Sequence, residues 1–289
     1  MDISINDRPA DITLDTEKNL GDVLSGIEQW ISASGNRIRA VSVNGMDLGD
    51  SLSEAFSKDI REIDKLDITI SSWRELAAEA LADLRETCVF YENALFEERA
   101  GIAALWEQSA AARFLASDIS DLYALADRSF SGEGLSAADL AVVTGERIRE
   151  IADPRREIDG SESLVKAIAA RMEELPLDIQ TGKDARAAET VQHFARLGEK
   201  LFRMFAIFKT AGLTVDSFII DGTPARIFID EFNAVLEELS AAYENKDTVL
   251  VGDLAEYEMA PRLLKFFEAL KNFSETQFRL PASPSVPSP

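Results

Sequence analysis

Apolar residues between positions 77 and 130 recur at alternating steps of four and three residues. The series is Ala77, Leu81, Leu84, Cys88, Tyr91, Leu95, Glu98, Ile102, Leu105, Ser109, Ala112, Ala116, Ile119, Tyr123, Ala126 and Phe130, with two plainly polar members and no proline. A sustained seven-residue repeat indicates a helix with a narrow apolar seam. The pattern predicts one long helix over residues 73–130, roughly 80 Å at about 1.5 Å per residue, or a helical hairpin. Gly101 and the Ser117–Asp118 pair are the expected points of bending.

The sequence does not decide what packs against this apolar seam. Alanine and leucine at helical spacing are common on the buried face of a bundle, which favours packing within the chain. An extended, dimerising coiled coil produces the same repeat, so a homo-oligomer formed through residues 77–130 stays an alternative.

In residues 1–72 the apolar period changes to two. The predicted elements are strands over 1–5 and 10–14, a helix over 20–31, a strand over 38–43, a short helical piece over 52–57 and a strand over 66–70. Asn6-Asp7-Arg8-Pro9 predicts a turn that makes the first two strands a hairpin. Thr16 and Asn19 are both candidate caps for the first helix.

Four stretches of this region carry a resemblance to a known fold. They are Ile3-Ser4-Ile5-Asn6-Asp7, Leu20 to Leu24, Val41-Ser42-Val43-Asn44-Gly45 and Asp67-Ile68-Thr69-Ile70. Residues 1–72 are similar to the β-grasp, or ubiquitin-like, fold and most similar to small bacterial sulfur-carrier proteins. Those carriers act through a C-terminal Gly-Gly, whereas here the last strand continues into Ser71-Ser72-Trp73. The resemblance therefore implies a docking module and not a sulfur carrier.

Helical periodicity continues after residue 130 and predicts a bundle. The expected helices cover residues 136–150, 161–174, 184–211, 224–245 and 247–273, with a loop at 153–160. Residues 213–220 fit either a strand or a loop between helices. Thr223 and Pro224 are expected to start the fourth of these helices. Pro261 is expected to kink the last one near Met259, and the phenylalanine-rich faces are interpreted as core.

These patterns together predict an α+β protein. A β-grasp domain spans residues 1–72, an α-helical bundle or coiled-coil domain spans 73–279, and a disordered Pro/Ser-rich tail spans 280–289. Ser72 with Glu75 forms a candidate capping box, so we expect a rigid strand-to-helix junction between the two domains.

The charge narrows the range of partners. The chain of 289 residues carries 30 Lys and Arg against 52 Asp and Glu, a formal net charge of −22. Such a field repels nucleic acid and anionic membrane surfaces and favours a basic protein partner. The sequence contains no apolar run long enough to span a membrane. Its opening residues do not have the pattern of a signal peptide, so a cytoplasmic location is expected.

Candidate chemistry is sparse. His193 is the only histidine and is interpreted as a surface or hydrogen-bonded core residue beside Phe194. Cys88 is the only cysteine, so an internal disulfide is excluded, and it is interpreted as a buried small hydrophobe. No catalytic, cofactor-binding or metal-binding residues are predicted.

One local cluster, Glu256-Tyr257-Glu258, is a candidate contact surface. The interpretation we favour there is a buried tyrosine between two solvated carboxylates.

We expect a non-catalytic cytoplasmic adaptor or scaffold that binds proteins through its β-grasp module and acidic helical surface. The alternative is an enzyme or small-molecule-binding protein with a pocket inside the helical bundle. A solid aromatic core would count against that alternative.

Overall fold

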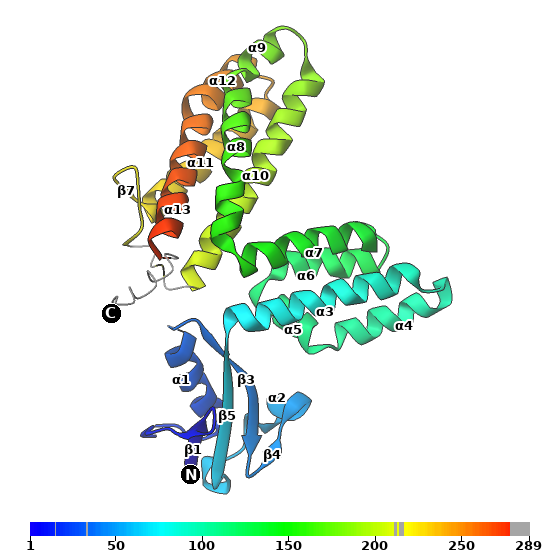
Figure 1. The fold of residues 1–289 in the computed structure, drawn as a ribbon, viewed down its shortest axis with the longest axis vertical. Coiled ribbons are helices and arrows are strands. Elements are labelled where there is room, and N and C mark those ends of the chain that lie inside the picture. Colours follow the sequence, from blue (N-terminus) through cyan, green and yellow to red (C-terminus); the bar gives the residue numbers. More distant parts are fainter. Residues whose placement is uncertain (15, 33, 211–212, 214–216, 278–289) are drawn as a thin grey trace, which may run out of the picture. The chain divides into compact units, whose positions relative to one another are not determined.

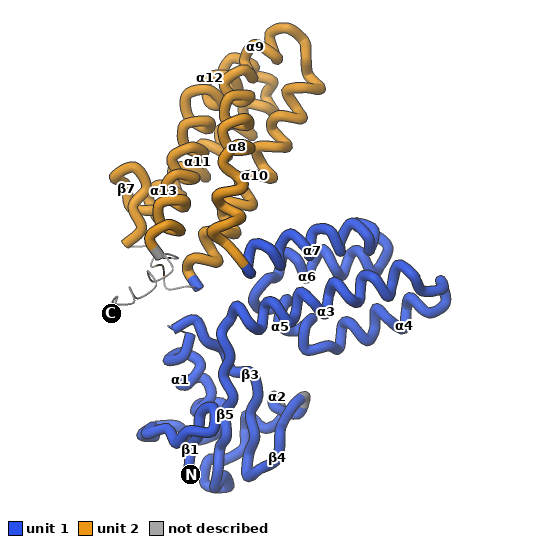
Figure 2. Tube along the Cα trace, in the orientation of Figure 1, with its two compact units in different colours: residues 1–152, 210–212 blue, residues 153–209, 213–289 orange. Residues whose placement is uncertain are grey.

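Residues 1–14, 16–32, 34–210, 213 and 217–277 are described by a computed structural model. The chain divides into two compact units, of which unit 1 consists mainly of residues 1–152 and unit 2 of residues from 153 onward (Figure 2). The expected α+β class is confirmed, because a five-stranded mixed sheet precedes a mainly helical remainder (Figure 1). The expected Pro/Ser-rich tail, 280–289, lies outside the described residues.

The N-terminal sheet packs against one helix. Its strands are β1 Asp2–Ile5, β2 Arg8–Pro9, β3 Asn36–Val43, β4 Met46–Asp47 and β5 Lys65–Ser72, in the order β2-β1-β5-β3-β4. Strand β1 is parallel to β5, and the other pairs are antiparallel. The apolar face of helix α1, Leu20–Ser32, contacts alternate strand residues such as Ile3, Leu66 and Ile68 in one hydrophobic core. Short helical turns η1 Gly49–Ser51, α2 Leu52–Ala55 and η2 Ile60–Glu62 connect β4 to β5.

The second predicted strand, 10–14, is wrong. Asn6 and Asp7 have positive φ angles of 48° and 61° and make a tight turn that pairs Arg8 with Ile5. The backbone N–H of Ala10 still donates to the carbonyl of Ile3 at 2.9 Å, but β1 begins at Asp2, only one residue before Ile3. Residues 12–14 therefore have no strand opposite them. Of the two candidate helix caps, Asn19 is the one used, because its Oδ1 accepts from the backbone N–H of Asp22 at 2.9 Å.

The strand-to-helix junction has the expected capping box. Strand β5 ends at Ser72, and helix α3, Trp73–Asn93, begins at the next residue. The Ser72 hydroxyl accepts from the backbone N–H of Glu75 at 3.2 Å, and the Glu75 carboxylate accepts from the Ser72 N–H at 3.0 Å. The Trp73 indole Nε1 donates to Asp118 at 3.0 Å, and the Arg37 guanidinium lies 3.4 Å from the same carboxylate. These contacts tie the sheet to the first turn of α3 within unit 1.

The predicted single helix over residues 73–130 is wrong. The chain folds there into α3, α4 Phe96–Glu107, α5 Ala110–Asp118 and α6 Ser120–Phe130, and α7 Ala137–Ala152 completes unit 1. The two polar members of the repeat lie at two of the three breaks between these helices. The Glu98 carboxylate accepts from the backbone N–H of Leu95 at the start of α4, and the Ser109 hydroxyl accepts from that of Ala112 at the start of α5. These side chains accept hydrogen bonds from backbone N–H groups that would otherwise lack a partner at the start of a helix, so the breaks cost little free energy. Folding back also buries the apolar face within the chain.

Of the two predicted points of bending, the Ser117–Asp118 pair is correct, since α5 ends at Asp118. Gly101 lies inside α4 and does not interrupt it. The chain does fold back on itself, as the hairpin alternative expects, but it does so after Asn93.

Unit 2 is a helical bundle with a short hairpin. Its elements are α8 Pro154–Glu173, α9 Leu175–Gln180, α10 Asp184–Thr210, β6 Ile219–Ile220, β7 Thr223–Pro224, α11 Ala225–Glu244, α12 Thr248–Asp253, the π-helical segment η4 Leu254–Met259 and α13 Ala260–Gln277. The helical part expected as one domain, 73–279, thus contributes to both units, a division that the sequence pattern did not indicate.

Two expected features of unit 2 are wrong. The loop over residues 153–160 is helical, because Asp153 caps α8 by accepting from the Arg156 N–H at 3.0 Å and Pro154 occupies the first turn. Thr223 is not the helix cap, because Thr223 and Pro224 pair with β6 across a turn in which Asp221 and Gly222 have positive φ. Helix α11 begins at the next residue, with Pro224 in the N-cap position. The irregularity expected near Met259 is present as the π-helical segment η4, which ends just before Pro261.

Phenylalanine rings fill the interior of unit 2, as expected from the sequence. Phe208, Phe232 and Phe266 are almost completely buried. Neighbouring rings have centroids 5.0 to 6.4 Å apart, in tilted, stacked and edge-to-face pairs. This packing joins α10, α11 and α13 in one aromatic core.

Candidate protein-binding surface

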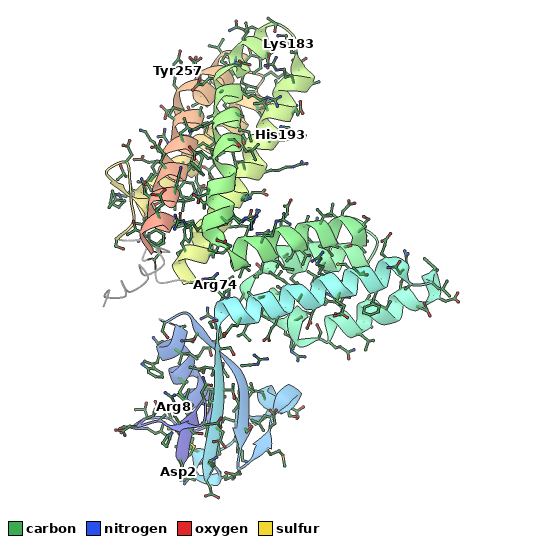
Figure 3. All side chains as sticks on the ribbon, viewed as in Figure 1. Asp2, Arg8, Arg74, Lys183, His193 and Tyr257 are labelled. Carbon is green, nitrogen blue, oxygen red and sulfur yellow. The ribbon has the colours of Figure 1, made fainter. Side chains whose placement is uncertain are left out.

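The predicted contact residues Glu256, Tyr257 and Glu258 lie on η4. Tyr257 has 65% of its surface exposed, so the interpretation of it as a buried residue is wrong (Figure 3). Its hydroxyl shares a hydrogen bond with Glu256, which raises the pKa of Tyr257 above its usual value. Glu258 forms an ion pair with Arg262 one turn later. The cluster is therefore a single exposed aromatic ring beside paired carboxylates, and its role as a contact surface stays a prediction.

The chain has one cysteine and one histidine, Cys88 and His193. Cys88 is fully buried, and burial raises the pKa of its thiol to about 12, so the prediction of a buried small hydrophobe is confirmed. His193 is half-buried on α10 (Figure 3). Within the described part of the chain, no three His, Cys, Asp or Glu side chains are grouped so that they could hold a metal ion.

Large apolar side chains are exposed on α3, on α4 and at the turn between them. Phe96 is 90% exposed, Leu105 74% and Phe90 59%, and Val89 and Leu95 are also more than half exposed. Single exposed apolar residues are normal on protein surfaces, but several on two neighbouring helices make this region a candidate interaction surface. The sequence pattern did not single out Phe90 or Phe96, because neither belongs to the seven-residue repeat.

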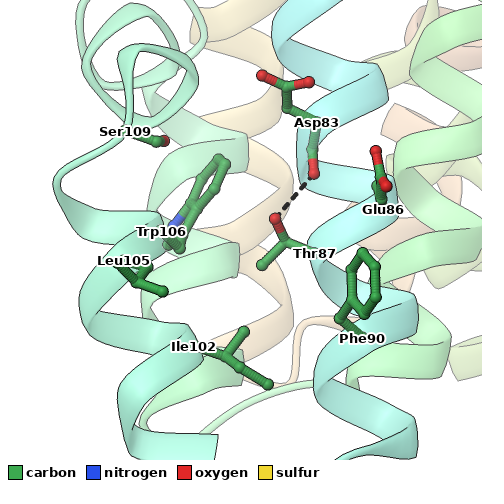
Figure 4. A pocket seen from close by; sticks show the side chains of 8 residues that line it. All are labelled: Asp83, Glu86, Thr87, Phe90, Ile102, Leu105, Trp106 and Ser109. Atoms are coloured by element: carbon green, nitrogen blue, oxygen red, sulfur yellow. Dashed lines mark hydrogen bonds between the residues drawn. The ribbon is translucent and has the colours of Figure 1, made fainter.

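A groove runs between these two helices. It has a volume of about 380 Å³ and is lined by Asp83, Glu86, Thr87, Phe90, Ile102, Leu105, Trp106 and Ser109 (Figure 4). In this α3–α4 groove, Phe90 and Thr87 on α3 face Ile102 and Trp106 on α4. The Thr87 hydroxyl donates to the backbone carbonyl of Asp83 at 2.8 Å, so the hydroxyl is satisfied within its own helix. The walls offer mainly apolar contact area and little fixed polar chemistry.

Acidic side chains border the groove on the α3 side. Asp83 and Glu86 are exposed, and neither carboxylate has a hydrogen-bond or ion-pair partner among the described residues. Glu79 lies one turn before Asp83 and pairs with Arg39 at 3.0 Å, with both side chains about half exposed. Exposed pairs of this kind contribute little stability. The groove therefore combines an apolar interior with a negatively charged border.

A second apolar hollow lies in the sheet domain. It has a volume of about 610 Å³, and its walls include Ile12, Leu14, Val23, Ile27 and Trp30. Residues 10–14 form one side, because they leave the sheet and lie along α1 instead of pairing as a strand. Trp30 is 67% exposed at the end of α1. Its position makes this hollow a candidate contact site on the N-terminal module.

No helix within the described residues is both long enough and apolar enough to cross a membrane.

Comparison with known proteins gives two partial family matches. Residues 1–72 match the family described as the TP0873 N-terminal domain, and residues 158–269 match a domain of unknown function, DUF8042. An uncharacterized protein of Treponema pallidum (strain Nichols) is 32% identical to this chain over 95 residues, which is 33% of this chain and 47% of that protein. The chain thus matches about half the length of this relative. No solved structure matches the chain. The chain is therefore similar to one family over its sheet domain and to another over part of its C-terminal bundle.

Proposed function

We propose that this protein is a non-catalytic adaptor that works in the cytoplasm by binding other proteins. The observation that carries the proposal is the α3–α4 groove with the exposed Leu105 in its lining, together with the exposed Phe96 at the start of α4. A monomer gains nothing in stability from such residues in water, whereas burial against a partner is favourable by about 25 cal/mol for each Å² of apolar surface.

The sheet domain supports a docking role. Its mixed sheet, with β1 parallel to the central strand β5 and one helix packed on the sheet, supports the β-grasp resemblance of residues 1–72. Strand β5 passes into α3 without a diglycine or a free carboxylate, so the chemistry of the sulfur carriers has no attachment point here. What this module offers instead is the apolar hollow beside Trp30, which would take part in binding.

The partner could also be a second copy of the chain, bound through residues 77–130. In α3 the repeat residues Ala77, Leu81, Leu84 and Cys88 are buried within unit 1, so they are not available to another chain. Any dimer through the repeat would have to use its exposed apolar members, which include Leu95, Leu105 and Ala116.

The proposal is tested by affinity capture from bacterial lysate with matched variants of the full chain. Leu105→Glu places a charge in the groove, and Val142→Glu does the same at a similarly exposed position of α7 outside it. We expect wild type and the Val142 variant to retain the same proteins and the Leu105 variant to lose some of them.

Light scattering on the same three proteins tests self-association. A wild-type dimer that the Leu105 variant cannot form would assign the groove to a second copy. A monomer whose captured proteins are the same in all three samples would refute the adaptor proposal.

A further inference from the structure

The outer face of α3 continues the α3–α4 groove toward the sheet domain. A smaller hollow of about 100 Å³ lies beside α5, lined by residues that include Leu76, Glu79 and Phe114, and it shares Asp83 with the groove. Together the two hollows make a trough along α3 from Leu76 to Phe90. Its length is about 21 Å at about 1.5 Å per residue, which is close to four turns of an α-helix.

The charges along the trough are arranged by helical spacing. Glu79, Asp83, Glu86 and Phe90 are separated by four, three and four residues and therefore share one face of α3. The opposite face carries the buried residues Ala77, Leu81, Leu84 and Cys88. The trough thus has a row of carboxylates along one side, and Asp83 and Glu86 in that row have no cationic partner among the residues that the structure describes.

We infer that the trough binds an amphipathic helix of another protein, about four turns long, with apolar residues on one face and lysine or arginine beside them. Leucine-sized side chains fill the groove between Phe90, Ile102 and Leu105, and the cations pair with Asp83 and Glu86. The inference rests on the proposed adaptor function and names the class of its partner.

Charge distinguishes this occupant from a second copy of the chain. The apolar residues that a second copy could insert, Leu95 and Phe96, are followed directly by Glu97 and Glu98. These carboxylates would approach the acidic border of the trough, in a chain that already carries a net charge of −22. Like charges at an interface are costly, whereas a basic helix is attracted to the same border.

The test uses a synthetic helical peptide of about 16 residues, labelled with fluorescein, with leucine at positions i, i+3, i+4 and i+7 and lysine beside them. Its binding to the full chain is followed by fluorescence anisotropy. We expect saturable binding that weakens as salt is raised, and at least tenfold weaker binding of a peptide with glutamate in place of lysine.

Two pairs of variants locate the site. Asp83→Lys with Glu86→Lys is expected to weaken binding about tenfold, which is about 1.4 kcal/mol. Glu237→Lys with Glu238→Lys makes the same change in net charge on the exposed side of α11 and is expected to change affinity less than twofold. Leu105→Ala is expected to weaken binding at least fivefold, and Val142→Ala is its control.

The inference is overturned if the lysine peptide does not bind, or if both double variants weaken binding equally, because the attraction would then be unspecific. This failure is distinguishable from failure of the adaptor proposal. Leu105-dependent capture of proteins from lysate without peptide binding would keep the adaptor and remove the helical partner. Peptide binding that depends on the groove, without any Leu105-dependent capture of proteins, would keep the groove as a helix-binding site and remove the adaptor proposal.

Discussion

Leu84 and Leu105 occupy the same position of the seven-residue repeat, three repeats apart, and the structure gives them opposite environments. Leu84 on α3 is fully buried, whereas Leu105 on α4 is 74% exposed. A continuous helix that dimerises through its seam would bury both residues in the same way. Replacing each by alanine therefore distinguishes the folded-back helices from the long helix.

The magnitudes follow from burial. Removing a buried leucine side chain loses its transfer free energy and leaves a cavity, so Leu84→Ala is expected to lower the free energy of unfolding of unit 1 by about 2–5 kcal/mol. Leu105→Ala changes a solvated position and is expected to stay within about 0.5 kcal/mol. With a urea m-value of about 2 kcal/mol/M, a loss of about 3 kcal/mol lowers the urea midpoint by about 1.5 M.

Tryptophan fluorescence makes the measurement specific to unit 1. The three tryptophans, Trp30, Trp73 and Trp106, all belong to that unit, so unfolding of the C-terminal bundle contributes no direct signal. Equal destabilisation by both substitutions, together with a midpoint that rises with protein concentration, would refute the folded-back arrangement in favour of a dimer through the seam.

Three further changes test other parts of the structure. The thiol of Cys88 is buried with a pKa of about 12, so it should react with a thiol reagent in the native chain far more slowly than in urea. Gly252→Ala places a Cβ 2.9 Å from the Cβ of Pro176, so it should lower the thermal midpoint of unit 2 by circular dichroism through a loss of about 1–3 kcal/mol. Hydrogen bonds from Lys166 and Lys271 lower the pKa of Glu162 to about 2, so the stability that this carboxylate contributes is present above its unfolded pKa near 4.5 and is lost toward pH 2. The difference in stability between wild type and Glu162→Gln should therefore shrink over that range.

Local patterns predicted most of the helices and strands. The 3.6-residue spacing of apolar side chains located α1, α7, α10 and α11 to within a few residues, and it predicted α12, η4 and α13 as one helix. Alternation located β1, β3 and β5. The capping box at Ser72 and the irregularity before Pro261 were also predictable, because both depend on residues next to one another in sequence.

The sequence could not indicate where the continuous seven-residue repeat is divided into separate helices. Glu98 and Ser109 read as tolerated polar members of the repeat, and only the folded chain shows that they satisfy the backbone at the starts of α4 and α5. The same side chains are compatible with both arrangements, and the choice depends on the burial gained when α3 packs against α5 and α7. The groove was missed for this reason, since its two walls lie on one helix in the long-helix interpretation.

The trough also predicts the direction in which the proposed partner helix binds. Along the outer face of α3 the first three residues, Glu79, Asp83 and Glu86, are acidic and the last, Phe90, is aromatic. The exposed Leu95 and Phe96 extend the apolar end beyond α3. Because carboxylates attract cations and apolar surface attracts apolar side chains, a bound helix should place its more basic half near the sheet domain and its more apolar half near the α3–α4 turn. A peptide whose lysines are spread evenly would bind equally well in either direction. A peptide with most of its lysines in one half should bind in one direction only, with that half next to Glu79, Asp83 and Glu86.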